Sequence, residues 1–205
     1  MKLVPKSKNK LAPIIGIGIV ILCLGALTFV LIQSRFNSIP QVISSLTSSK
    51  EKAAFPEVDA ANLSTDQQKV IEILRTEYAL NPPGAKYSDG VEEAWCADFV
   101  SWVFKEADMP LSNPNSGSWR IPGTYTLREY YESAGKLRLS NSNYSPKIGD
   151  VMLYDNPSPF GQHVNIVIKN DNVAITTIGG NEPGGIRVVK HTEPDTDGFI
   201  GYGVF

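Results

Sequence analysis

The chain has 205 residues, of which 42% are hydrophobic and 20% are charged, and this composition excludes a wholly disordered or fibrous protein. All 21 acidic residues lie after Arg35, whereas five of the 19 basic residues lie at or before it, so the body of the chain is acidic. A nucleic-acid partner would require a basic face, and we therefore expect no nucleic acid to bind.

The first predicted element is a membrane anchor over residues 11–33, after a short cytoplasmic N-terminus at residues 1–10. Residues 11–32 contain no charged side chain, and a membrane-spanning helix needs about 20 apolar residues. Four lysines precede this run and Arg35 follows it, so the positive-inside rule places the rest of the chain outside the cytoplasm at the cell membrane. Two alternatives stay open, a cleaved signal peptide and lipidation at Cys23.

Residues 34–63 are rich in Ser and Ala and are predicted to be a linker, followed by one domain at residues 64–205. The first helix of this domain should begin at Ser64 or Thr65, where a glutamine three residues later completes a capping box. Its buried face would consist of residues at helical spacing, namely Val70, Ile71, Leu74 and Tyr78. The sequence Asn-Pro-Pro-Gly at residues 81–84 should end this helix.

A second helix is predicted to begin near Trp95 or Cys96, since apolar residues recur at helical spacing up to Ala107. The chain after Leu137 carries short β-branched runs separated by turn residues. These runs are residues 150–154, 163–168, 173–178, 186–190 and 200–205. Helices followed by clustered strands predict an α+β domain with an antiparallel sheet.

Cys96 is the candidate nucleophile, because the first turn of a helix stabilises a thiolate. Its base must be a histidine, and the chain contains His163 and His191. His163 opens a strand run beside a loop and is the predicted base, whereas His191 lies in an acidic, polar stretch and is predicted to be a surface residue. The alternative is that Cys96 is a small buried hydrophobe and His163 a structural residue.

The segment WCADFVSWVF at residues 95–104 resembles the nucleophile helix of the CHAP family, the cysteine, histidine-dependent amidohydrolases/peptidases. Further segments are similar to this family in the same order along the chain, namely IGDVMLY, HVNIVI, TTIGGN and IGYGVF. The resemblance covers residues 64–205. It implies a papain-like fold, hydrolysis of peptidoglycan amide bonds, Cys96 as nucleophile and His163 as base.

This chain departs from the family pattern in two places. Asn165 stands where the family usually has Gly, and Gly179 stands where many relatives have Glu. Asn181 matches the family's Asn, and an amide oxygen can accept the imidazole N–H and fix the ring. The predicted site is therefore Cys96, His163 and Asn181. Glu182 is a weaker candidate because strand alternation would point it to the other face.

The sequence thus predicts a membrane-anchored peptidoglycan hydrolase, acting either as an N-acetylmuramoyl-L-alanine amidase or as an endopeptidase. Its predicted partners are the peptidoglycan peptide and the membrane. With two histidines and no clustered third ligand, no metal is expected, and there is no cofactor-binding fingerprint. Because the usual Glu is absent, a catalytically weak module that binds wall peptides or an envelope partner is the alternative.

Overall fold

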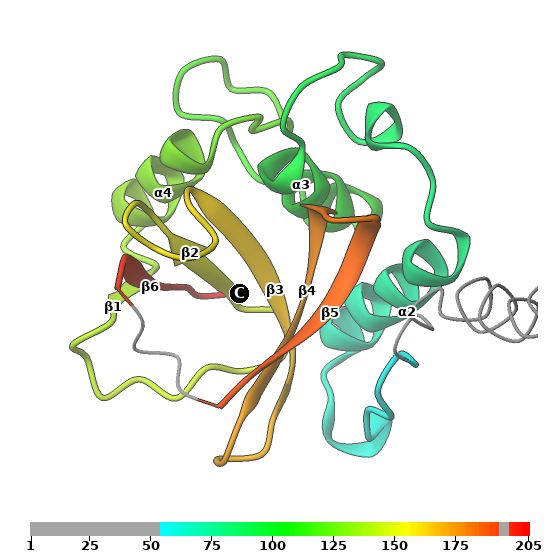
Figure 1. Ribbon diagram of the computed structural model, residues 1–205, viewed down its shortest axis with the longest axis vertical. Helices are drawn as coiled ribbons and strands as arrows, with labels where there is room; N and C mark the ends of the chain where they lie inside the picture. Colours follow the sequence, from blue (N-terminus) through cyan, green and yellow to red (C-terminus); the bar gives the residue numbers. More distant parts are fainter. Residues whose placement is uncertain (1–53, 193–196) are drawn as a thin grey trace, which may run out of the picture. The chain divides into compact units, whose positions relative to one another are not determined.

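The computed structural model describes residues 54–192 and 197–205, which belong to one compact unit (Figure 1). The predicted cytoplasmic N-terminus, the membrane anchor and most of the linker lie outside the described residues. Within the described part of the chain, no helix is long enough and apolar enough to cross a membrane.

Helix α2 (Thr65–Leu80) begins where its capping signal predicts. The Ser64 side chain accepts a hydrogen bond from the backbone N–H of Gln67, and the Gln67 side chain accepts one from the backbone N–H of Ser64. This reciprocal pair satisfies two donors at the helix N-terminus. Asn81 ends the helix in the left-handed conformation, as the Asn-Pro-Pro-Gly sequence favours.

Helix α3 (Cys96–Glu106) begins at Cys96, with Trp95 as its N-cap, and the predicted position of this helix is confirmed. Helix α4 (Thr124–Ser133) was not predicted, because its N-cap is Gly123 and gives no side-chain capping signal. Two single-turn 3₁₀ helices, η1 (Ala60–Asn62) and η2 (Gly84–Lys86), flank α2.

In the part of the chain that the structure describes, six strands form one antiparallel sheet in the order β1-β6-β2-β3-β4-β5. Their bounds are β1 (Leu137–Leu139), β2 (Val151–Tyr154), β3 (His163–Asn170), β4 (Ile175–Glu182), β5 (Gly185–His191) and β6 (Phe199–Gly203). The predicted α+β class is confirmed, and the arrangement is compatible with a CHAP fold. The three-residue strand β1 was not predicted, since it is too short to show a period.

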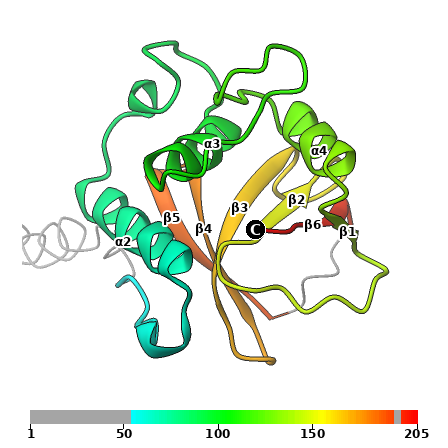
Figure 2. The same cartoon turned by 180° about the vertical axis from the view of Figure 1, so that it is seen from behind.

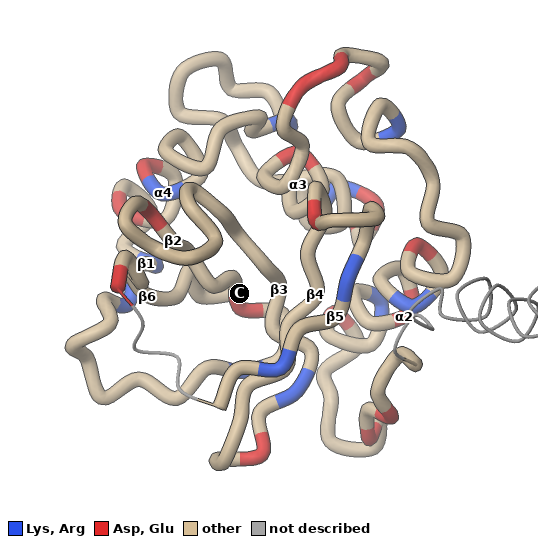
Figure 3. The backbone as a smooth tube through the Cα atoms, viewed as in Figure 1, with Lys and Arg blue, Asp and Glu red and all other residues tan. Residues whose placement is uncertain are grey.

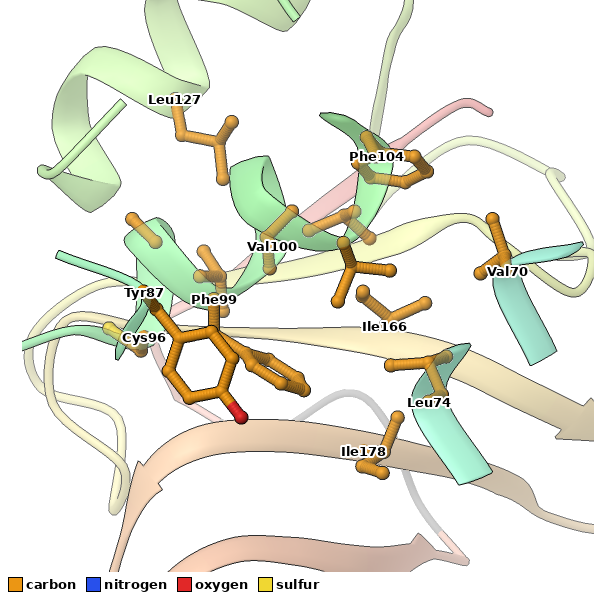
Figure 4. Packing of buried hydrophobic residues seen from close by; sticks show 14 of the residues in the cluster. Val70, Leu74, Tyr87, Cys96, Phe99, Val100, Phe104, Leu127, Ile166 and Ile178 are labelled. Carbon is orange, nitrogen blue, oxygen red and sulfur yellow. The ribbon is translucent and has the colours of Figure 1, made fainter. Parts of the chain in front are cut away.

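The main hydrophobic core is built from residues of the helices and of the sheet. The view from behind shows α3 beside β3 and β4 (Figure 2). Phe99, Val100 and Phe104 of α3 are buried against Ile166 of β3 and Ile178 of β4 (Figure 4). Because strand side chains alternate, the intervening residues of β3 face the opposite side of the sheet. The core therefore holds α3 across β3 and β4 and fixes the start of α3 against the sheet.

The described part of the predicted linker packs on the domain. The Phe55 ring lies 5.9 Å from the ring of Tyr78 on α2, and the Arg75 guanidinium stands over the Phe55 ring. Val58 and Leu63 are also packed against the main core. The residues just before Ser64 thus contribute to the same unit as the predicted domain.

Candidate active site

Cys96 is a free cysteine at the first residue of α3, and 4% of its surface is exposed. Its place at a helix N-terminus puts it beside backbone N–H groups that have no partner within the helix. These groups and the helix dipole favour a negative charge at the sulfur. The described geometry therefore suits Cys96 to act as a nucleophile.

His163 opens β3 and is 6% exposed, and Cys96 is close enough to the imidazole to raise its pKa. On the other side, its Nε2 atom lies 3.0 Å from Oε1 of Glu182, at the end of β4. The Phe160 ring stacks near the imidazole, with 6.5 Å between the ring centres. The fold thus places the His163 imidazole next to both the Cys96 thiol and the Glu182 carboxylate.

The charges around the ring make His163 a stronger base than an ordinary histidine. Burial lowers the pKa of His163, but its hydrogen bonds to Cys96 and Glu182, together with their negative charges, outweigh this effect. The net result is that the pKa of His163 is raised from 6.5 to about 9. At neutral pH the imidazole is therefore protonated next to the sulfur.

His191 is not a surface residue, and the prediction from its polar sequence context is wrong. It is 7% exposed, and its Nε2 atom lies 2.9 Å from the hydroxyl oxygen of Thr177. Burial lowers the pKa of His191, so this ring stays neutral at neutral pH. The ring of Phe160 contacts both histidines, with its centre 5.8 Å from that of His191.

Asn181 and Glu182 lie at a β-bulge, and this changes their expected directions. Gly179 pairs with Arg187 and Glu182 pairs with Gly185, so β4 contains one more residue than β5 over this stretch. Asn181 has a φ of 60°, the left-handed conformation that Asn tolerates. Glu182 consequently reaches His163, and the expectation that it points to the other face is wrong.

The side chain of Asn181 is exposed and makes no hydrogen bond within the described part of the chain. Its predicted position beside the imidazole is taken by the Glu182 carboxylate. The acidic positions in the segment before α3 and at the end of β4 are visible in Figure 3. The site therefore contains a carboxylate even though Gly179 replaces the usual Glu.

The two departures from the family pattern, Asn165 and Gly179, are neighbours in space. A Cβ atom at Gly179 would lie 1.7 Å from Oδ1 of Asn165 and 3.3 Å from Nε2 of His163. Asn165 is fully buried, and its amide atoms have no hydrogen-bond partner in the described structure. The Asn165 amide thus fills the space that a side chain at position 179 would need.

Substitution of Gly179 by Ala should therefore destabilise the domain by about 1–3 kcal/mol, the usual cost of overpacking. The measurement is the free energy of unfolding in urea. The Gly179→Ala protein should regain stability when Asn165→Ala is added, and additive losses in the double variant would contradict the clash.

Arg120 lies in the long segment after α3 and forms an ion pair with this helix. Its Nε atom lies 2.8 Å from the buried carboxylate of Asp98, and its guanidinium also pairs with Glu93. Burial raises the pKa of Asp98 to about 6, although Arg120 opposes this shift. The backbone N–H of Ile121 donates to the Ser101 hydroxyl, which fixes the same segment. Arg120 thus holds the segment after α3 against the helix that carries Cys96.

Comparison with known protein families covers Cys96 and His163 but ends one residue before Glu182. Residues 86–181 match the CHAP domain. The match covers a little under half of the chain and includes α3, with Cys96, and β3, with His163. CHAP domains are typically hydrolases that act on peptidoglycan. Neither the curated proteins nor the solved structures contain a match to this chain.

Proposed function

We propose that this protein is a cysteine hydrolase that cleaves amide bonds of bacterial peptidoglycan. The observation that carries the proposal is the chain of contacts from Cys96 at a helix N-terminus, through buried His163, to Glu182. The CHAP match over residues 86–181 supports the substrate class. Nucleophile, base and orienting group within contact distance are the usual arrangement for acyl transfer.

In the proposed mechanism, the Cys96 proton resides on His163 and the thiolate attacks the amide carbonyl carbon. Since Nε2 of His163 contacts Glu182, the other ring nitrogen, Nδ1, is left to exchange the proton with the sulfur in this mechanism. The free backbone N–H groups at the start of α3 stabilise the oxyanion. His163 then protonates the leaving amine, and a water molecule activated by the neutral imidazole releases the acyl group from sulfur.

We further propose that residues 11–33 anchor this hydrolase in the cell membrane, with the catalytic domain outside the cytoplasm. The support is the uncharged run at residues 11–32 and the lysines before it. The chain expressed in bacteria should resist extraction from membranes by alkaline carbonate and dissolve in detergent. Release by carbonate alone would contradict the anchor.

The activity is tested by digesting purified peptidoglycan with the fragment of residues 53–205 and, separately, with the Cys96→Ala variant of this fragment. The soluble products are identified by mass spectrometry. The wild-type fragment alone should release new fragments. Loss of the whole peptide from the sugar would identify an amidase, and cleavage within the peptides would identify an endopeptidase. Wild-type protein that is folded, binds peptidoglycan and releases nothing would favour the non-catalytic binding module.

A further inference from the structure

The end of β4 departs from regular strand geometry at the residues that face the candidate active site. In a regular strand Gly179 and Asn181 would share one face, and Glu182 would point to the other. The extra residue opposite β5 and the left-handed conformation of Asn181 break this alternation. A bulge of this kind re-aims the side chain that follows it.

The re-aimed side chain is Glu182. Its carboxylate contacts Nε2 of His163 at 3.0 Å, with only 11% of the Glu182 side chain and 7% of the His163 side chain exposed. Little solvent therefore screens this contact, and a charged hydrogen bond in such a place is stronger than one at the surface. The Asn181 side chain, by contrast, is exposed to solvent.

A carboxylate could not reach the ring from position 179 in this chain. Any side chain there would overlap the buried amide of Asn165, because even a Cβ atom would lie 1.7 Å from its Oδ1. The Asn165 amide thus leaves no room for a side chain at position 179. A carboxylate can contact the His163 ring from position 182, and the bulge is required for that contact.

We propose that Glu182 is the positioning residue of His163, and that Asn181 serves the site through its left-handed backbone and not through its amide. The proposal rests on the hydrolase function above and deepens it. The Glu182 carboxylate accepts the Nε2–H bond, which holds the ring in one orientation and turns Nδ1 toward the sulfur of Cys96. Its negative charge also stabilises the imidazolium that protonates the leaving amine.

Four variants of the 205-residue chain separate the two roles, namely Glu182→Gln, Glu182→Asp, Asn181→Gly and Asn181→Ala. Glycine lacks the amide but adopts the left-handed conformation without cost, whereas alanine lacks both features. We expect Asn181→Gly to keep at least about half of the wild-type kcat. Glu182→Gln should lower kcat about 10- to 100-fold. The kcat of Glu182→Asp should lie between that of Glu182→Gln and that of the wild type.

A second readout does not depend on peptidoglycan. The His163 imidazole is titrated by NMR, with its signals distinguished from those of His191 by a His163→Gln variant. Loss of the Glu182 charge should move the His163 titration to lower pH in Glu182→Gln, and the titration in Asn181→Gly should match the wild type. The His163 titration in Asn181→Ala should lie between those of Glu182→Gln and the wild type, since strain in the bulge moves Glu182 away from the ring.

The proposal is overturned if Asn181→Gly loses activity and shifts the His163 titration while Glu182→Gln behaves as the wild type, because the amide would then orient the ring. It is equally overturned if Glu182→Gln leaves the titration unchanged in a folded protein. If no variant and no wild-type protein cleaves peptidoglycan, the hydrolase function fails, and the NMR titrations still decide whether Glu182 holds His163.

Discussion

Replacement of Cys96 by Ala is expected to reduce the rate of cleavage of peptidoglycan by about 10⁴-fold or more. Removal of the nucleophile in enzymes that form an acyl intermediate has an effect of this size, because the remaining groups cannot form the covalent bond. The measurement is the rate of release of soluble peptide from a fixed amount of peptidoglycan. Cys96→Ser is expected to be almost as inactive, since a hydroxyl ionises far less readily than a thiol.

Cys96 is 4% exposed, so a loss of activity could also come from a damaged core. The control is Ala97→Ser, which changes the neighbouring buried residue of α3 and leaves the sulfur in place. Both variants are compared with the wild type by urea unfolding. A Cys96→Ala protein that unfolds like the wild type and still cleaves at more than about a tenth of its rate would contradict the assignment of the nucleophile.

Replacement of His163 by Gln should lower kcat by about 10³-fold, within the usual range for loss of a general acid and base. The wild-type enzyme should also lose activity as pH rises through about 9, since the pKa of His163 is raised to that value. The sign follows from the mechanism, because the imidazolium must supply the proton for the leaving amine. Deprotonation of His163 removes that proton, so the protonated form below pH 9 is the active one.

The pH profile of kcat/KM measures this effect directly. The control is His191→Gln, because His191 is the buried histidine that is hydrogen-bonded to Thr177 and not to Glu182 in the described structure. We expect His191→Gln to keep the fall near pH 9. If activity persists unchanged well above pH 9, or if His163→Gln retains most of the activity, His163 is not the acid and base of this site.

The positions of Cys96 and His163 could be predicted because regular structure determines them. The helical spacing of apolar residues after Trp95 places Cys96 at the start of α3, and the β-branched run after His163 places the imidazole at the start of β3. Hydrophobic periodicity determines which face of each element is buried. The same periodicity therefore determines where the first residue of each element lies.

The carboxylate could not be predicted in this way. The alternation rule assumes a regular strand, and β4 contains a bulge at the residue that precedes Glu182. Asn followed by Glu-Pro-Gly-Gly at residues 181–185 was a usable signal, because Asn is among the residues that tolerate a left-handed conformation. His191 was misplaced for a related reason, since its polar neighbours in sequence indicate a surface although its contacts in the fold are Thr177 and Phe160.

The central claim is that the Cys96 sulfur forms a covalent bond to the acyl part of its substrate. The most direct measurement is the intact mass of the protein, quenched in acid during the cleavage of soluble peptidoglycan fragments, followed by peptide mapping. We expect a fraction of the wild-type chain to carry the added mass of the acyl fragment, attached to Cys96 and absent from Cys96→Ala. Cleavage that proceeds without such an adduct and survives the loss of Cys96 would contradict this account.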